Sequence, residues 1–462
     1  MKNMKMIRTG LVLAASLTLA ACALQTPPST VTGDAAQQWQ APLPHNGSVQ
    51  GLANWWHDLG DPLLAHVIEQ AQVHSPTVAA ASSRIAQSRA ERIAAGAALL
   101  PTLDAAASAN RMSQQSTLPM GTTTQAALQS AWEIDLFGAR RAEADAAQAR
   151  LAGANASWHE ARVSVAAEVA SQYYSLRACL RLQDVALQDA ASRADTARLS
   201  ELSSAAGFQA PASSALARAS AAEGRSRALQ QRALCDLDVK ALVALTAIAE
   251  PQLRLELEND IADNLKEPAI ATLPAQTLSQ RPDVYGAERE VAAASIDVGT
   301  AQATRYPRLS LSGSVGAANF RSAGNNTTLT AWSIGPLALT LPLYDGGTRR
   351  ANVDAAIARY DQAVIQYRAS VRQAVREVET ALVNLDSSAR RAVDAQVALD
   401  GYRTFFVAAD SRYRNGLASL LELEDARRTR LAAENAVINL QRERRLAWVA
   451  LYRAAGGGWV AP

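Results

Sequence analysis

The sequence predicts a mainly α-helical fold with four β-strands of membrane-spanning length, arranged as two copies of one unit. Three observations support this fold class. Proline and glycine residues recur in the same order in the two halves, each half has two segments of alternating side-chain polarity, and each half has a very long segment without proline. Apolar residues, many of them alanine, make up 49% of the chain and aromatic residues only 5%, which is typical of long helices packed through small side chains.

The overall charge argues against a nucleic-acid partner. The 462 residues include 45 Lys+Arg and 43 Asp+Glu, so the formal net charge is +2. Nucleic-acid binding depends on a concentrated basic surface, and a nearly neutral chain supplies no such field over its length.

Residues 1–21 have the layout of a secretory signal peptide. A positively charged start precedes an apolar segment, Leu11 to Ala20, that is too short to span a bilayer. The small residues before Cys22 resemble a bacterial lipobox, which implies a lipid on that cysteine, and Ala23 implies sorting to the outer membrane. The alternative is an ordinary signal peptide followed by a chance cysteine. Residues 22–51, rich in polar residues and proline, are expected to be the lipidated N-terminus and a linker.

An internal repeat organises the rest of the chain. Matching residues occur in the same order in both halves, first 206 and then 209 positions apart, and one three-residue insertion explains the change. Because proline and glycine mark breaks in the backbone, a series that includes both indicates a duplication. The first copy is expected over residues 52–250 and the second over 251–455, followed by a tail, 456–462. The matches include Pro76 with Pro282, Pro101 with Pro307, Gly138 with Gly347 and Gly207 with Gly416.

Each copy contains two expected strands, at about 101–111 and 125–137 in the first and at about 307–319 and 329–344 in the second. Their side chains alternate between an apolar face and a small or polar face, which is the period of a strand. A length of about ten residues suits a tilted strand that crosses a membrane. No apolar segment after the signal approaches the length of a membrane helix, so any crossing would use these strands. The alternative is two edge hairpins in a soluble domain.

A helical hairpin is expected after each strand pair, at about 139–245 and about 348–452. No proline interrupts the first arm of either hairpin, and each arm ends at a turn glycine, Gly207 or Gly416. At about 1.5 Å per residue, an arm of about 65 residues would extend roughly 100 Å, which no compact domain requires. Apolar residues of the second hairpin recur in steps of three and four, the spacing of a coiled-coil stripe.

Four strands in one chain leave two open sheet edges. An open edge in lipid costs several kcal/mol for each unpaired backbone group, so the strands can cross a membrane only if several chains close them into a barrel. Three chains would form a barrel of twelve strands, within the even-numbered range of membrane barrels. The same symmetry would gather three copies of each helical hairpin into an α-barrel, and the result would be a tunnel.

Several groups of residues, in order along the duplicated chain, carry a family resemblance. They are Cys22; Trp55, Trp56, Leu59, Asp61, Pro62 and Leu64; Arg281 to Val284; Leu341 to Gly347; and Tyr413 to Gly416. On these residues the chain resembles the TolC/OprM-type outer-membrane efflux channels of the NodT lipoprotein group, over nearly all of its mature length.

The resemblance implies a homotrimer with a β-barrel in the outer membrane and a helical tunnel in the periplasm. It implies two further partners, a periplasmic adaptor protein and an inner-membrane pump of the RND class, which is typically proton-driven. The function that it implies is passive export of drugs or other small toxic compounds through the trimeric tunnel.

The resemblance also implies a periplasmic gate, where acidic residues just after the tip glycine surround a constriction. The matching positions are Glu422 and Asp425, with Glu424 beside them. Spaced i, i+3, Glu422 and Asp425 would share one helix face, and three chains would gather their carboxylates around one axis, where they would attract cations. Glu422 replaces the family's usual aspartate, which leaves its role in narrowing the pore open.

The alternative for these acids is a solvated helix surface that pairs with Arg427, Arg428 and Arg430. The first copy has Ser214 and Leu216 in the corresponding stretch, without acids, so any gate is asymmetric between the two hairpins.

Two cysteines remain besides Cys22. Cys179 and Cys235 are equally far from Gly207 in sequence, so an antiparallel hairpin that turns there brings them to the same height. An oxidising periplasm favours a disulfide between them. Two buried free thiols are the alternative, because equal height does not ensure disulfide geometry.

No enzyme motif is found. The histidines lack metal-ligand spacing, and neither a Walker A loop nor a Gly-x-Ser-x-Gly elbow is present. The sequence therefore predicts no catalytic, cofactor-binding or metal-binding residues, apart from the lipid on Cys22. Two alternatives to the efflux channel stay open. One is a lipid-anchored coiled-coil tether, which would need no strands, and the other is a protein-secretion channel. The sequence does not identify the exported compound.

Overall fold

The computed structural model describes residues 26–33, 40–41, 55–112, 120–259, 278 and 281–459. The expected signal peptide, Cys22 and most of the linker lie outside these residues, as does the end of the tail after residue 459. The chain divides into two compact units. The sheet unit comprises residues 1–33, 83–155 and 286–369, and the hairpin unit comprises residues 34–82, 156–285 and 370–462.

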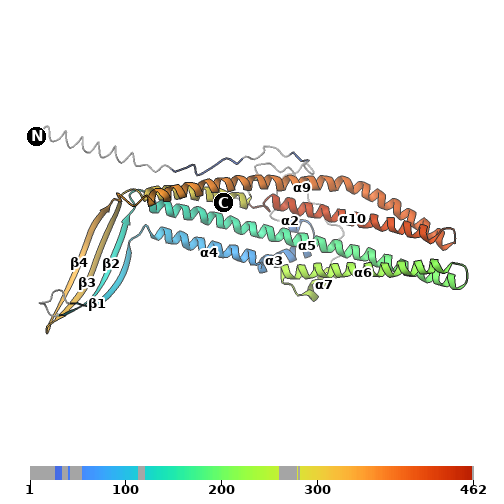
Figure 1. The fold of residues 1–462 in the computed structure, drawn as a ribbon, viewed down its shortest axis with the longest axis horizontal. Helices are drawn as coiled ribbons and strands as arrows, with labels where there is room; N and C mark the ends of the chain where they lie inside the picture. Colours follow the sequence, from blue (N-terminus) through green and yellow to red (C-terminus); the bar gives the residue numbers. More distant parts are fainter. Residues whose placement is uncertain are drawn as a thin grey trace. The chain divides into compact units, whose positions relative to one another are not determined.

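The sheet unit contains one four-stranded antiparallel sheet in the order β1-β2-β3-β4 (Figure 1). Consecutive strands therefore lie side by side, and the strands of the two halves meet where β2 pairs with β3. The prediction of a helix-rich chain with four antiparallel strands is confirmed. The strands are β1 (Thr102–Met112), β2 (Gly121–Ile134), β3 (Arg308–Ser322) and β4 (Asn325–Thr340).

Strands β2 and β4 begin and end several residues earlier than the sequence predicts. At the start of β2, the polar residues expected in a loop join the ladder, and Thr123 pairs with both Asn110 and Phe320. The β-branched threonines suit such a position. The strand ends before Asp135, whose carboxylate accepts hydrogen bonds from the backbone N–H groups of Arg140 (3.2 Å) and Arg141 (2.9 Å). This aspartate therefore serves the start of the next helix and not the strand.

The register assigns the sheet two chemically different faces. Residues opposite each other on neighbouring strands share a face. One face, called the apolar face here, carries Leu128 opposite Val315 and Trp132 opposite Leu311. The other, called the polar face, carries Gln129 opposite Ser314 and Glu133 opposite Ser310.

Helices complete the sheet unit. Arg150 of α5 (Ala139–Ala205) pairs with Asp297 (2.5 Å) and Glu290 (3.6 Å) of α8 (Pro282–Ala303). Gly153 of α5 faces α8, where an added Cβ would make ordinary van der Waals contact, 3.6 Å from the Gly286 carbonyl oxygen. A buried apolar cluster joins α8 to α9 (Thr348–Arg414): Val291, Ala294, Val298, Ala356 and Tyr360.

The hairpin unit is entirely helical in the described residues. Asp61 caps α3 (Pro62–His74) by accepting from the Leu64 N–H (2.9 Å), and its other oxygen accepts from the Tyr173 hydroxyl of α5 (2.9 Å). Helices α4 (Pro76–Ala97), α5, α8 and α9 contribute residues to both units. The other described helices are α2 (Trp55–Asp58), α3 (Pro62–His74), α6 (Pro211–Thr246), α7 (Glu250–Asn259) and α10 (Leu420–Ala454).

Two antiparallel helical hairpins, α5–α6 and α9–α10, dominate this unit (Figure 1). Both first arms are 67 residues long, close to the length predicted from the absence of proline. Among the described residues, no helix is both long and apolar enough to cross a membrane.

Candidate functional site

The candidate site lies at the turns of the two hairpins and in the helices that follow them. The sequence predicts turns at Gly207 and Gly416, and both glycines adopt positive φ angles, +79° and +74°. The backbone closes each turn in the same way: Phe208 N–H donates to the Ser203 carbonyl (2.9 Å), and Leu417 N–H donates to the Arg412 carbonyl (2.7 Å). Glycine suits this left-handed position, because it has no Cβ to clash with the backbone.

Each second arm has its own start signal. Pro211 occupies the first turn of α6, where its missing N–H is not needed. Ser419 caps α10, since its hydroxyl accepts from the backbone N–H of Glu422 (3.2 Å). The acidic residues singled out from the sequence therefore fall in the first turns of α10.

Glu422 and Asp425 each form an ion pair with a nearby arginine. Arg412, in the last turn of α9, contacts Glu422 at 2.6 Å and so connects the two arms of its hairpin. Arg428 contacts Asp425 at 2.6 Å within α10, and both of these side chains are largely exposed. Within the single chain, Asp425 thus pairs with an arginine of its own helix, as the alternative to a gate proposes. Glu422 instead pairs with an arginine on the other side of the turn.

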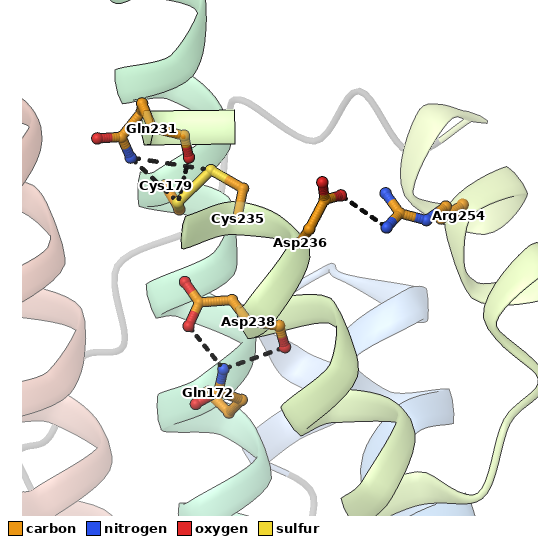
Figure 2. Close-up of a disulfide and its surroundings, with 7 residues drawn as sticks. All are labelled: Gln172, Cys179, Gln231, Cys235, Asp236, Asp238 and Arg254. Atoms are coloured by element: carbon orange, nitrogen blue, oxygen red, sulfur yellow. Dashed lines mark hydrogen bonds and ion pairs between the residues drawn. A yellow bond between two sulfur atoms is a disulfide. The ribbon is translucent and has the colours of Figure 1, made fainter. Parts of the chain in front are cut away.

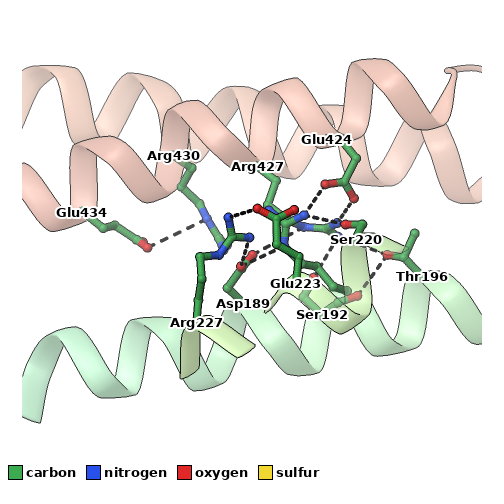
Figure 3. Close-up of polar contacts among 11 residues, drawn as sticks. Asp189, Ser192, Thr196, Ser220, Glu223, Arg227, Glu424, Arg427, Arg430 and Glu434 are labelled. Atoms are coloured by element: carbon green, nitrogen blue, oxygen red, sulfur yellow. Dashed lines mark hydrogen bonds and ion pairs between the residues drawn. The ribbon is translucent and has the colours of Figure 1, made fainter. Parts of the chain in front are cut away.

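Glu424, to which the sequence assigned no role of its own, is the acid that points into the helix packing (Figure 3). It accepts hydrogen bonds from Arg427 of the same helix and from Arg193 of α5, both at 2.5 Å. Arg193 also contacts Asp189 at 2.8 Å. These four residues, Asp189, Arg193, Glu424 and Arg427, are called the buried ion network below.

Arg427 lies at the centre of the buried ion network with no exposed surface. Its guanidinium donates to the hydroxyls of Ser192 and Thr196, both at 3.1 Å, across to α5 (Figure 3). Burial lowers the pKa of Arg427, and the nearby Glu424 carboxylate opposes that shift. Such a charge is tolerated in the interior only because carboxylates and hydroxyls surround it.

Arg193 carries the network to a third helix. Its guanidinium donates to the Ser220 hydroxyl of α6 at 2.5 Å. Gly224 of α6 makes room for it, since a Cβ at that position would lie 2.8 Å from Arg193 Cδ. The buried ion network therefore connects α10 to both arms of the α5–α6 hairpin.

An apolar cluster, Ala197, Ala217, Ala221, Leu420 and Leu423, packs between the same helices. Phe406 and Tyr413 of α9 cover it. At the corresponding level of the first copy, Ser214 is buried and Leu216 is 49% exposed.

Cys179 and Cys235 form a disulfide between α5 and α6, with their Cα atoms 5.5 Å apart (Figure 2). A second connection lies close by, where Gln172 of α5 donates to the Asp238 backbone carbonyl (3.2 Å) and side chain (3.1 Å) of α6. The hairpin is thus held together by one covalent bond and by polar contacts.

The lipidation site predicted at Cys22 lies outside the described residues. Within the described ranges, no group of three or more His, Cys, Asp or Glu side chains is arranged to hold a metal ion.

The family model for outer membrane efflux proteins matches residues 67–247 and 273–457 of this chain. The chain belongs to the outer membrane efflux protein family. It is 31% identical to the pyoverdine export outer membrane protein OpmQ of Pseudomonas aeruginosa, over 99% of this chain and 97% of that protein. It is also 29% identical to the solvent efflux pump outer membrane protein SrpC of Pseudomonas putida, over 86% of each chain.

The fold of this outer membrane efflux protein is similar to that of a solved relative. The outer-membrane channel OprN aligns with a TM-score of 0.85 and 28% identity, covering 95% of this chain and 99% of that one. The family resemblance predicted from the sequence is confirmed, and so is the location in the outer membrane. The family is one of channels and not of enzymes.

Proposed function

We propose that this outer membrane efflux protein is the exit channel of a tripartite efflux system and passively conducts drugs or other small toxic compounds. The observation that carries the proposal is the sheet, which has one apolar and one polar face and ends in β1 on one side and β4 on the other. A sheet with these properties is suited to a membrane barrel wall.

A homotrimer would complete this wall. If β1 of one copy pairs with β4 of the next, three sheets close into a barrel of twelve strands, and no edge remains open in lipid. The apolar face would then contact lipid and the polar face would line the lumen. The same symmetry would gather the α5–α6 and α9–α10 hairpins of three copies into a periplasmic α-barrel.

The order of elements supports the proposed duplication. Two strands followed by a helical hairpin occur twice, as β1-β2-α5-α6 and as β3-β4-α9-α10. The proposed copies, 52–250 and 251–455, each contain one such series. The proposed lipid on Cys22 would add a second attachment to the outer membrane.

The proposed partners are a periplasmic adaptor and an inner-membrane pump of the RND class. Relatives support a small cargo: OpmQ is named for pyoverdine export and SrpC for solvent efflux. These names favour small-molecule efflux over protein secretion. A coiled-coil tether, the other alternative, would not require a sheet with two distinct faces.

The hairpin tips at Gly207 and Gly416 would form the periplasmic end of the tunnel, and we place the gate beside them. In the proposed trimer, Glu422 and Asp425 of three copies would surround the axis. Arg412 and Arg428, which pair with these carboxylates, offset part of their field. The buried ion network would hold α10, which carries both acids, against α5 and α6.

Single-channel recording in planar bilayers tests this function. The purified protein should produce discrete conductance steps, and Glu422→Gln combined with Asp425→Asn should change the conductance and weaken the preference for cations. Glu443→Gln is a matched control, because Glu443 also lies on α10 and forms an exposed ion pair, with Arg391 at 2.9 Å. A protein that never conducts would contradict the channel, whereas conduction that is unchanged in the double variant would remove both acids from the gate.

A further inference from the structure

The polar face of the sheet changes in character along its length. Starting at the end joined to the helices, β3 presents Arg308, Ser310, Ser312, Ser314, Gly316 and Ala318 on this face, and then Phe320. At the end joined to the helices, Asp104 of β1 and Glu133 of β2 add two further charged side chains to this face. The face is therefore charged near the helices and loses its charge toward the Ser322–Asn325 turn.

Three large apolar side chains interrupt this polar face, among the described residues of the four strands. Met112, Phe320 and Leu329 are 52%, 47% and 63% exposed in the single chain. The Leu and Trp side chains that would contact lipid lie on the opposite face. A membrane-facing role therefore does not explain these three residues.

The strand register places the three residues close together. Residues that lie opposite one another on neighbouring strands form a row across the sheet, and successive rows of one face are two residues apart. Met112 lies opposite Gly121, which pairs with Ser322. Phe320 lies in the next row of this face, opposite Thr123. Leu329 lies one row further on, opposite Ala318. They occupy the three rows nearest the Ser322–Asn325 turn.

Gly121 shows how the Phe320 ring is held. A Cβ at Gly121 would lie 2.7 Å from Cε2 and 2.8 Å from Cζ of Phe320. The ring edge therefore occupies space beside β2 that any larger residue at position 121 would take. Aromatic rings that cover a strand glycine in this way stabilise the sheet.

We propose that Met112, Phe320 and Leu329 form an apolar collar at the far mouth of the lumen, which contacts uncharged aromatic cargo and restricts hydrated ions. The inference rests on the proposed trimeric channel, in which three copies of each residue surround the exit. Aromatic compounds gain stacking and apolar contact there. Neighbouring polar residues such as Thr123 and Thr327 stay in these rows, but the large apolar side chains between them reduce the polar contacts that ions can make, as in apolar constrictions of other channels.

The first test replaces the ring with the side chain that β3 carries elsewhere on this face. In planar bilayers, Phe320→Ser should raise the single-channel conductance in potassium chloride by about 1.5-fold or more, because an apolar constriction is removed. Indole, an uncharged aromatic probe, should reduce the current through the wild-type channel and reduce it less in the variant. Ala131→Ser is a control on the same face, far from the collar and opposite Ser312.

A second variant tests the position of the ring itself. Gly121→Ala should displace the Phe320 ring toward the lumen and lower the conductance. Adding Phe320→Ser to this variant should return the conductance to that of Phe320→Ser alone, because no ring remains to be displaced.

The outcomes separate this inference from the proposed function. If the wild type never conducts, the channel proposal fails and the collar falls with it. If the wild type conducts and Phe320→Ser leaves both conductance and indole block unchanged, the channel stands and the collar is wrong. If Gly121→Ala lowers conductance equally with and without Phe320, the ring does not cause the effect. Should Gly121→Ala fail to assemble, Phe320→Ser decides alone.

Discussion

At the scale of single residues, Arg427 shows how strongly burial changes the role of a charge. From the sequence, it is one of three arginines that the alternative to a gate pairs with acids on a solvated helix surface. The structure places it beyond the reach of solvent, between Glu424 and the hydroxyls of α5. Removing one partner of a buried charge network leaves the others desolvated and uncompensated, so Arg427 is a stabilising residue of the hairpin unit.

We predict that Arg427→Met lowers the free energy of unfolding by about 3–5 kcal/mol, because the buried Asp189 and the partly buried Glu424 would lose this charge partner. Thermal unfolding of the detergent-solubilised protein, followed by circular dichroism, measures the change. Arg428→Met is the matched control: the Arg428 side chain is 76% exposed, and surface changes of this kind stay within about 0.5 kcal/mol. Equal losses in the two variants would contradict a stabilising role for the buried ion network.

At the scale of secondary-structure elements, the α5–α6 hairpin was the most predictable part of the chain. The absence of proline, the turn glycine and the equal spacing of Cys179 and Cys235 around it are all visible in the sequence. The strand boundaries were less predictable. Asp135 directly follows β2 and accepts backbone N–H bonds at the start of α5, so helix capping limits that strand. Asp345 accepts the same kind of bond at the start of α9, but β4 already ends at Thr340.

We predict that the disulfide is present in the protein as exported. The intact mass should rise by two hydrogens on reduction, and only the reduced protein should react with a thiol-alkylating reagent. Cys179→Ser with Cys235→Ser should lower the free energy of unfolding by up to about 4 kcal/mol, from the loop entropy for a sequence separation of 56 residues. Reduction of the wild type should produce the same loss. Two free thiols in the untreated protein would contradict the prediction.

At the scale of the whole molecule, the open sheet edges determine the expected assembly. A single sheet with terminal strands β1 and β4 cannot lie in a bilayer without leaving backbone groups unpaired. Native mass spectrometry in detergent should therefore show three chains in one particle, and a denatured sample should show one. A native particle containing a single chain would be inconsistent with a shared barrel.

The sequence by itself determined the family, the helix-rich fold with four antiparallel strands and the turns at Gly207 and Gly416. These features depend on local periodicity, on backbone breaks at glycine and proline, and on motif order, all of which can be read along one chain. Only the tertiary structure decided which acid of α10 joins the buried ion network and which apolar residues share the polar face. Glu424 meets Arg193, and Phe320 covers Gly121, across about 200 or more residues of sequence. Such contacts depend on helix packing and strand register, which set the distances between residues that local patterns cannot relate.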